Sequence, residues 1–457
     1  MSPSFKSAAA LGRAFALLSA TFVGAALGVM TERAGGRRPG HELPGRDAPS
    51  PLREAAGVDA APPPLSPLMQ KTVSKGLPSD ERVRFFDGFV ASLNYERRIP
   101  NWVLEYIPGP AAATATPRGG DSGGGGDDES SLRAKREGMK FFADTTVPET
   151  FRVSPDDYGG GREEERRLRP TRGLSRGHLA AAQFHKTSPK EMAETFNMNA
   201  NIVPQDMTMN AVDWLRLENL TKKLLRRYEG GLWVVTGPVF HPRHVYGDPR
   251  AWGWTESRST SAITPAVAPD DVKKARKVVC YELVGKHDVA VPTHLFKVLL
   301  GERSDGTHEV AAFLMPNEPI TDERPLVAYQ VTVAEVEKKT GLQFFRNALA
   351  AKDVATAPSW RARKAPTHGL DALPDICGRH SCEVRTAALF QSYRCIAQLR
   401  AAQSLPELQQ VFNRLLLERQ QQQQRDNANG AQLDAFVVKE YMQRKKELVE
   451  AAVAEVD

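Results

Sequence analysis

The 457-residue sequence is poor in cysteine and carries little net charge. Four cysteines in a chain of this length exclude a disulfide scaffold, so we expect Cys280, Cys377, Cys382 and Cys395 to be reduced thiols. The spacing Cys377-x4-Cys382, with His380 between them, lacks a second ligand pair, which argues against zinc. Lysine and arginine (61) exceed aspartate and glutamate (55) by only 6, so a polyanionic partner is allowed but not required. The apolar content of 41% excludes a fully disordered chain.

The sequence also lacks a long apolar run. The uncharged segment Ala14 to Met30 has 17 residues, which is the lower limit of the range of about 17–25 residues for a membrane-spanning helix. It is compatible with a cleaved secretory signal, with a mitochondrial presequence, or with a presequence whose apolar part remains as a membrane anchor. Arg33, Arg37 and Arg38 follow closely, which suits an anchor better than a cleavage region.

Composition divides the chain into folded and unfolded parts. Residues 34–75 are rich in proline, glycine and alanine and predict a disordered linker after a targeting or anchor segment, residues 1–33. Within the folded part, 76–360, two insertions at 111–131 and 246–276 interrupt the pattern. A helical, charged extension is expected over residues 375–457.

The folded part mixes strands and helices without a regular alternation. Short apolar runs at 233–240 and 310–316 predict strands, and leucines at helical spacing over 217–228 predict a helix. This mixture indicates an α+β fold.

One stretch of the chain gathers the residue types that phosphodiester hydrolysis needs. His178 can serve as the base that activates water, because imidazole titrates near pH 7. Asn210 offers a neutral oxygen to a hard cation such as Mg²⁺, and Glu218, about 80° around a helix from Asn210, can hydrogen-bond to the water around that cation. Arg176 can hold a phosphate oxygen, and Lys222 extends the cationic surface.

The same residues also have ordinary structural interpretations. Asn201 and Asn210, near Pro204, are typical turn and cap residues, and Lys222 is typical of a solvated helix face. Spacing alone therefore does not decide between a nuclease site and a structural segment.

Six motifs, taken in order, resemble one family of nucleases. They are SRGHLAAA, TF-x4-NIVPQD, MNAVDWLRLE, VVTGP, VAVPTHLFKV (289–298) and MPNEPI (315–320). Together they are similar to the mitochondrial endonuclease G branch of the DNA/RNA non-specific nucleases, over roughly residues 85–350. The resemblance implies a ββα-metal (His-Me finger) core, in which two strands and a helix present one histidine and one asparagine around a single Mg²⁺.

The resemblance also implies a role for particular residues. The family's general base falls on His178, its metal-binding asparagine on Asn210, its water-holding glutamate on Glu218 and its phosphate-binding arginine on Arg176. The asparagine before the VPQ turn falls on Asn201. A further family arginine best matches Arg136, in KREGMKF.

One departure from the common motif points to a particular branch of the family. Ser175 stands where most members have aspartate, and this form resembles the exonuclease-like branch of endonuclease G. That branch carries a helical extension called the wing, and Asp375-Ile376-Cys377, Cys382 and the segment 390–399 are similar to it.

The resemblance implies a mitochondrial nuclease that depends on Mg²⁺, with Mn²⁺ as the alternative, and leaves 5′-phosphate ends. Its implied roles are mitochondrial DNA maintenance or DNA degradation during cell death. The implied partners are DNA and RNA, the mitochondrial inner membrane through residues 1–33, and a second copy in a homodimer. The sequence does not reveal the preference for exo or endo cleavage, or for DNA or RNA.

Two rival functions remain. The first is a catalytically silent, membrane-tethered nucleic-acid-binding protein, although a decayed site would commonly have lost His178, Asn210 or Glu218. The second is a serine hydrolase, because GLSRG (173–177) and GDSGG (120–124) match Gly-x-Ser-x-Gly. That motif needs a buried strand before the serine, whereas charged and glycine-rich segments precede these two.

Overall fold

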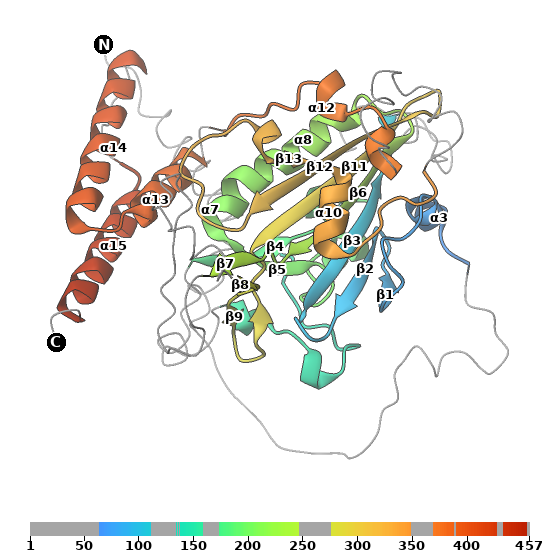
Figure 1. Ribbon diagram of the computed structural model, residues 1–457, viewed down its shortest axis with the longest axis horizontal. Coiled ribbons are helices and arrows are strands. Elements are labelled where there is room, and N and C mark those ends of the chain that lie inside the picture. The colour runs from blue at the N-terminus through green and yellow to red at the C-terminus, as the bar shows by residue number, and fades with distance from the viewer. Residues whose placement is uncertain are drawn as a thin grey trace, which may run out of the picture.

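The computed structural model (Figure 1) describes a large part of the chain. The described residues are 64–110, 134, 136, 138–158, 173–245, 276–348, 369–387, 390–426 and 433–454. The predicted N-terminal segment, residues 1–33, and the predicted insertion 111–131 lie outside them, as does nearly all of the second insertion. Within the described ranges, no helix combines the length and apolar character needed to cross a membrane.

A seven-stranded antiparallel sheet forms the centre of the molecule. Its strand order is β1-β2-β3-β6-β11-β12-β13. The strands are β1 (Val83–Phe85), β2 (Phe89–Asn94), β3 (Ile99–Ile107), β6 (Gly231–Val239), β11 (His294–Glu302), β12 (His308–Pro316) and β13 (Gln330–Val331). β6 and β12 confirm the strands predicted over 233–240 and 310–316.

A hairpin followed by a helix lies against one face of this sheet. The hairpin pairs β4 (Leu174–His178) with β5 (Ile202–Asp206). The chain continues through α7 (Met207–Met209) and a π-helical turn, η4 (Asn210–Trp214), into α8 (Leu215–Leu225). Asp206 starts this helical run, because its carboxylate accepts hydrogen bonds from the backbone N–H groups of Thr208 and Met209.

Short elements complete the described fold. The opposite face of the sheet carries α3 (Pro67–Val73) and α10 (Val333–Thr340) (Figure 1). The remaining elements are η1 (Glu149–Phe151), η2 (Pro155–Tyr158), η3 (Ala182–Phe184), α6 (Pro189–Glu194), β7 (Arg243–Val245), β8 (Arg276–Val278), β9 (Leu283–Val284), β10 (Val289–Ala290), η5 (Leu326–Tyr329), η7 (Gly369–Ala372) and α12 (Ile376–Arg379). The architecture is α+β, as predicted.

Two apolar cores lie on the two sides of the sheet. On β6, Leu232 and Val234 face a core that includes the buried leucines of α8, whereas Trp233 and Val235 face a core closed by α3 and α10. Successive side chains of a strand alternate between faces, so a strand covered on both sides is apolar throughout. This explains the uninterrupted apolar run that marked β6 in the sequence.

The helix α3 corrects the predicted extent of the linker, which was expected to reach residue 75. Ser66 caps this helix through a hydrogen bond from the Met69 N–H, and Pro67 occupies its first turn. Met69 and Thr72 are buried against the sheet. The tertiary contact that orders this short helix is not visible in the composition of the segment.

The described part of the C-terminal extension is largely helical, as its sequence predicted, and three long helices follow the short α12. They are α13 (Gln391–Ala401), α14 (Leu405–Asp426) and α15 (Ala435–Ala454), and they share a small apolar core. Figure 1 shows α14 and α15 projecting away from the sheet. α13 lies against the α+β core, where the buried Arg394 pairs with the buried Asp213 at 3.2 Å.

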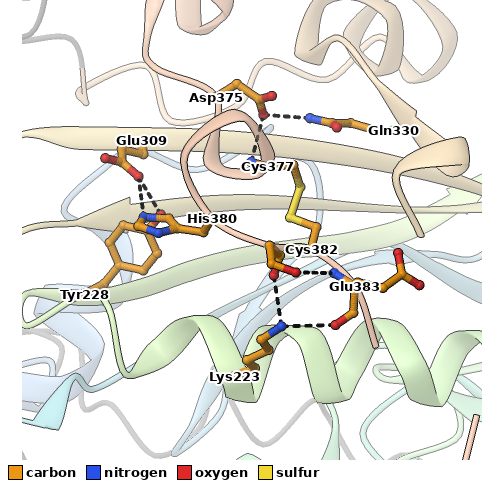
Figure 2. Close-up of a disulfide and its surroundings, with 10 residues drawn as sticks. Lys223, Tyr228, Glu309, Gln330, Asp375, Cys377, His380, Cys382 and Glu383 are labelled. Atoms are coloured by element: carbon orange, nitrogen blue, oxygen red, sulfur yellow. Dashed lines mark hydrogen bonds and ion pairs between the residues drawn. A yellow bond between two sulfur atoms is a disulfide. The ribbon is translucent and has the colours of Figure 1, made fainter. Parts of the chain in front are cut away.

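The prediction that all four cysteines are reduced is wrong for one pair. Cys377 and Cys382 form a disulfide (Figure 2), with Cα atoms 5.3 Å apart. A low cysteine count argues against a scaffold of many disulfides, but it does not exclude one local bridge between neighbouring residues. Cys280 and Cys395 are free. His380, considered for zinc, instead hydrogen-bonds to Glu309 at 3.1 Å.

The loop closed by this disulfide, Cys377–Cys382, is called here the disulfide clasp. Lys223, near the end of α8, donates to the carbonyl oxygens of Ser381 and Glu383, both at 3.1 Å (Figure 2). The clasp therefore joins α8 to the edge of the sheet and leads into the extension.

Candidate active site

The π-helical turn before α8 sets the relative direction of Asn210 and Glu218. In a uniform α-helix these side chains would lie about 80° apart around the axis. A π-helical turn accommodates about one additional residue, which reduces this angle to about 20°. Both residues consequently line the same pocket.

This pocket brings together most of the residues that the sequence analysis selected. It lies where the β4–β5 hairpin, the start of α8 and α13 meet. Its lining consists of Arg136, Ser175, Arg176, His178, Ala181, Ala182, Gln183, Met207, Asn210, Ala211, Leu215, Glu218 and Tyr393.

His178, the last residue of β4, is largely buried against two aromatic rings that also contact each other. Its ring centroid lies 4.9 Å from that of Phe196 and 5.5 Å from that of Phe141. Its Nε2 atom is buried without a hydrogen-bond partner among the described residues. Burial lowers the pKa of His178 well below its usual value, and the nearby Arg136 and His185 lower it further. The imidazole is therefore neutral at pH 7, which is the form that accepts a proton.

The amide of Asn210 is oriented by Ser175. The Ser175 hydroxyl donates to the Gln205 carbonyl at 3.1 Å and accepts a hydrogen bond from Asn210 Nδ2 at 3.0 Å. Because its nitrogen is engaged, the amide has its oxygen, Oδ1, left for a cation. This is a role for Ser175 that the sequence analysis did not assign.

Glu218 lies on the α8 side of the pocket, and among the described residues it has a single side-chain hydrogen-bond donor. Gln183 Nε2 donates to its Oε2 at 3.2 Å. Burial raises the pKa of Glu218 to about 7; Lys297 and Arg136 oppose this shift, whereas Glu105 adds to it. The carboxylate thus lacks full charge compensation from the protein.

Two arginines lie on the aromatic rings that also pack against His178. The Arg176 guanidinium carbon is 5.2 Å from the ring centroid of Phe141, and its Nη2 donates to the Pro155 carbonyl at 3.0 Å. The Arg136 guanidinium carbon is 5.7 Å from the ring centroid of Phe196. Burial lowers the pKa of both arginines, but arginine remains charged in proteins. Both arginines line the pocket, where their positive charges suit a phosphate.

Two of the selected residues lie outside the pocket lining. Asn201 is fully buried and accepts a hydrogen bond from the N–H of Ala180, while its Nδ2 donates to the carbonyls of Ala180 and Thr195. It therefore holds the chain just after His178 and does not reach the pocket. Lys222 is exposed on α8, one turn beyond Glu218.

Three residues at or behind the site were missed. Gln183 and Tyr393 line the pocket, and Lys297 is fully buried on β11, within electrostatic reach of Glu218. A single lysine inside the apolar run HLFKVLL was the available signal for Lys297. No local pattern distinguishes Tyr393, because α13 reaches the pocket only through the fold.

The donor set fits a hard divalent cation. Among the described residues there is no group of three or more His, Cys, Asp or Glu side chains that could hold a metal ion. Mg²⁺ commonly takes only one or two protein ligands and keeps several waters. One oriented amide oxygen at Asn210 beside the under-compensated carboxylate of Glu218 satisfies that requirement.

Comparison with known proteins places this chain in a family. The family model for DNA/RNA non-specific endonucleases matches residues 68–351. The chain is 31% identical to zebrafish (Danio rerio) "Nuclease EXOG, mitochondrial", with 82% of this chain and 84% of the relative covered. It is 30% identical to the human protein of that name, covering 73% and 70% respectively.

Two further relatives carry the endonuclease G name. The bovine (Bos taurus) "Endonuclease G, mitochondrial" is 30% identical over 66% of this chain and 81% of its own length. A solved structure described as an EndoG/EndoGI complex shows 27% identity and a TM-score of 0.46, covering 64% of this chain and 96% of that one.

These matches define the chain as a nucleic-acid phosphodiester hydrolase. It belongs to the DNA/RNA non-specific endonuclease family and is a nuclease of the endonuclease G/EXOG type. The family is one of metal-dependent nucleases, and the resemblance predicted from the motifs is confirmed.

Proposed function

We propose that this chain is a Mg²⁺-dependent, sugar-non-specific nuclease that cleaves DNA and RNA to 5′-phosphate and 3′-hydroxyl ends, with His178 as its general base. One observation carries this proposal. His178, Asn210 and Glu218 come from a strand, a π-helical turn and a helix, yet they line one pocket together with Arg136 and Arg176.

The side chains suggest how the reaction proceeds. Neutral His178 takes a proton from the water that attacks phosphorus in line with the leaving oxygen. Arg176, fixed by the Pro155 carbonyl, holds a phosphate oxygen. A divalent cation, when bound at Asn210, supplies neutralisation of the charge that develops on the phosphate and the leaving oxygen. Glu218 orients water beside Asn210, and the leaving 3′-oxygen takes its proton from that water.

The cationic residues account for the lack of base specificity. Contacts from arginine and lysine to the nucleic-acid backbone position a substrate without reading its sequence. Arg136 acts at the phosphate, whereas the exposed Lys222 extends the backbone contact along α8. Asn201 supports His178 from behind and is reassigned from catalysis to positioning.

The two rival functions fit the site less well. A silent nucleic-acid-binding protein has no need of an amide oriented at Asn210 or of a partly compensated carboxylate at Glu218. A serine hydrolase would need a serine activated by a base, whereas the Ser175 hydroxyl donates to the Gln205 carbonyl. The second Gly-x-Ser-x-Gly match, residues 120–124, lies outside the described residues.

The proposed location is the mitochondrion, with residues 1–33 as targeting segment and inner-membrane anchor. The support is the word "mitochondrial" in the names of the EXOG and endonuclease G relatives, together with the basic, acid-free start of the chain. The proposed roles are mitochondrial DNA maintenance or DNA degradation in cell death, and the proposed assembly is a homodimer. A reporter fused to residues 1–40 should enter mitochondria and remain partly in the pellet after alkaline extraction; secretion would contradict this.

The extension is proposed to act as a wing that restrains the path of the substrate strand. The support is Tyr393 of α13 in the pocket lining and the buried Arg394–Asp213 pair that fastens α13. Deletion of 375–457 would also remove core residues Ile376 and Cys382, so a point substitution at Tyr393 is the cleaner test.

A nuclease assay with matched substrates tests the proposed function. Plasmid, single-stranded DNA and a 5′-blocked oligonucleotide are incubated with the full chain and Mg²⁺ or a chelator. We expect degradation only with the metal and 5′-phosphate ends in the products. Activity that persists in chelator would contradict the cation-dependent mechanism, and intact substrates under both conditions would favour the silent binding protein. If Tyr393→Ala leaves the pattern of 5′-end and internal cuts unchanged, the wing role is wrong.

A further inference from the structure

The sheet face beneath α8 carries a row of polar side chains close to the pocket. Lys297 on β11 is paired in register with Thr236 on β6, and Thr236 in turn with Val103 on β3. Residues two apart on a strand share a face, so Glu105 lies on the same side as Val103. Glu105, Thr236 and Lys297 are all buried, among apolar neighbours such as Val234.

The Lys297 ammonium group is held in place by two contacts. Its Nζ donates to Thr236 Oγ1 at 2.7 Å and lies 5.1 Å from the ring centroid of Trp214. Trp214 and Glu218 are four residues apart, so they lie on the same side of the helix, one turn from each other. The ammonium group therefore contacts the helical turn that precedes Glu218.

Of the other charged groups in this layer, Glu105 is paired through one oxygen, while its Oε1 is buried without a hydrogen-bond partner among the described residues. His185 Nε2 hydrogen-bonds to Glu105 Oε2 at 2.9 Å, and its Nδ1 hydrogen-bonds to Glu191 at 3.2 Å. Burial alone would lower the pKa of His185, but Glu105 and Glu191 raise it to about 9, so the histidine is protonated and compensates for those carboxylates. Burial lowers the pKa of Lys297, and the two carboxylates that oppose this are Glu105 and Glu218.

We propose that Lys297 is a positioning residue for the nuclease reaction: its buried ammonium group compensates for the charge of the Glu218 carboxylate from behind the pocket. This inference rests on the proposed role of Glu218. Lys297 is 2% exposed and has no access to a substrate, so it acts through Glu218 and not by binding nucleic acid. A fully buried lysine in this layer thus has a function that packing alone would not require.

Turnover of plasmid DNA in a double-mutant cycle tests the proposal. The variants are Lys297→Met, Glu218→Gln and the two combined, with Lys338→Met on the exposed side of α10 as the matched control. We expect Lys297→Met to lower kcat by about 10–100-fold, as the loss of a supporting partner typically does, with KM for DNA unchanged. The combined variant should lie within about threefold of Glu218→Gln alone, because Lys297 then has no carboxylate to support.

Thermal unfolding of the metal-free protein gives a second, independent measurement. Lys297→Met should lower Tm by leaving Glu218 and Glu105 uncompensated, and adding Glu218→Gln should restore part of the loss. If Lys297→Met does not fold, Thr236→Val replaces it, because it removes only the hydroxyl that fixes the ammonium group. Thr236→Val should lower kcat, leave KM unchanged, and lose its effect in the Glu218→Gln background.

The outcomes separate this proposal from the proposed function. Multiplicative losses of kcat in the combined variants, or a raised KM in Lys297→Met or Thr236→Val, would overturn the positioning role while leaving the nuclease mechanism intact. Full activity of Glu218→Gln by itself would instead contradict the mechanism on which the inference rests.

Discussion

Two glutamates on the same side of the sheet, the half-buried Glu218 and the buried Glu309, are supplied with hydrogen-bond donors very differently. Among the described residues, Glu218 accepts one side-chain hydrogen bond, from Gln183. Glu309 on β12 accepts from the Tyr228 hydroxyl at 2.8 Å and also bonds to Arg303, Arg379 and His380 (Figure 2 shows the Tyr228 and His380 contacts).

The number of hydrogen-bond donors around each carboxyl group decides the direction of its pKa shift. Burial by itself raises the pKa of Glu309, but hydrogen bonds from Tyr228, Arg303 and Arg379 outweigh burial and lower it. At Glu218 burial prevails and raises the pKa to about 7. Burial alone therefore does not distinguish a catalytic carboxylate from a structural one, whereas the donors around it do. At the pocket end of α8, the negative charge of Glu218 is not fully compensated by the protein, which favours a bound cation. At the clasp end, hydrogen bonds from the protein compensate for the negative charge of Glu309.

The largest expected effect is on activity at the pocket. His178→Ala should lower turnover by about 10²–10⁴-fold, because it removes the general base, while Tm stays near that of the parent. Plasmid cleavage and thermal unfolding measure the two quantities. A variant that cuts plasmid within a few-fold of the parent would remove His178 from the mechanism.

The next largest effect concerns the cation. Asn210→Ala should raise the Mg²⁺ concentration for half-maximal activity by at least about 10–100-fold, since even outer partners of a metal site cost this much. Ser175→Ala should cause a smaller rise, because it only frees the Asn210 amide. Mg²⁺ titrations of cleavage that superimpose for parent and Asn210→Ala would refute the ligand assignment.

At the clasp the expected effect is on stability. Glu309→Gln should lower the free energy of unfolding by about 1–3 kcal/mol, because donors around a buried carboxylate lose a charged partner. Glu335→Gln on the exposed side of α10 is the control and should change stability by less than about 0.5 kcal/mol. Urea unfolding provides the measurement, and kcat should be unchanged. If Glu309→Gln lowers kcat without lowering stability, the clasp end of α8 serves catalysis as the pocket end does, and the comparison is wrong.

A similar effect is expected for the disulfide. Replacing Cys377 and Cys382 together by serine removes a bridge with a sequence separation of 5, for which loop-closure entropy predicts a loss of about 2 kcal/mol. Cys280→Ser, at an exposed free thiol, is the matched control. Reduction of the parent protein should reproduce the effect of the double variant in urea unfolding. Equal stability of oxidised and reduced protein would show that the hydrogen bonds of the clasp suffice.

The smallest expected effect is a pair of opposite pH dependences of stability in the metal-free protein. The pKa of Glu218 rises from 4.5 to about 7 on folding, so its contribution to stability is full below pH 4.5 and is lost as pH rises toward 7. The pKa of Glu309 falls on folding, so its contribution is present above pH 4.5 and is lost as pH falls below that value.

Unfolding of Glu218→Gln and Glu309→Gln in chelator between pH 4 and 7.5 measures these slopes. Glu218→Gln should remove a decline of Tm on the neutral side, and Glu309→Gln should remove a decline on the acid side. If the two substitutions change the pH dependence of Tm in the same direction relative to the parent, the comparison is wrong.

Much of the fold and of the site was predictable from local sequence. The apolar runs of β6 and β12 and the leucine spacing of α8 are local patterns, and each formed the predicted element. His178, Asn210 and Glu218 stand in short motifs whose order along the chain identified the family, and all three line the pocket. Asn201, from the same motifs, was placed too close to the chemistry.

The remaining features depend on contacts between residues far apart in the chain. The π-helical turn that aligns Asn210 with Glu218, and the approach of Tyr393 to the pocket, follow from packing that no spacing rule encodes. Whether a charged group is compensated depends on neighbours from other elements, as Lys297 behind Glu218 and Arg379 beside Glu309 show. The sequence by itself determined which side chains are present and which elements they form. Only the tertiary structure decided their charges and mutual directions, because electrostatic fields and hydrogen bonds act through space and not along the chain.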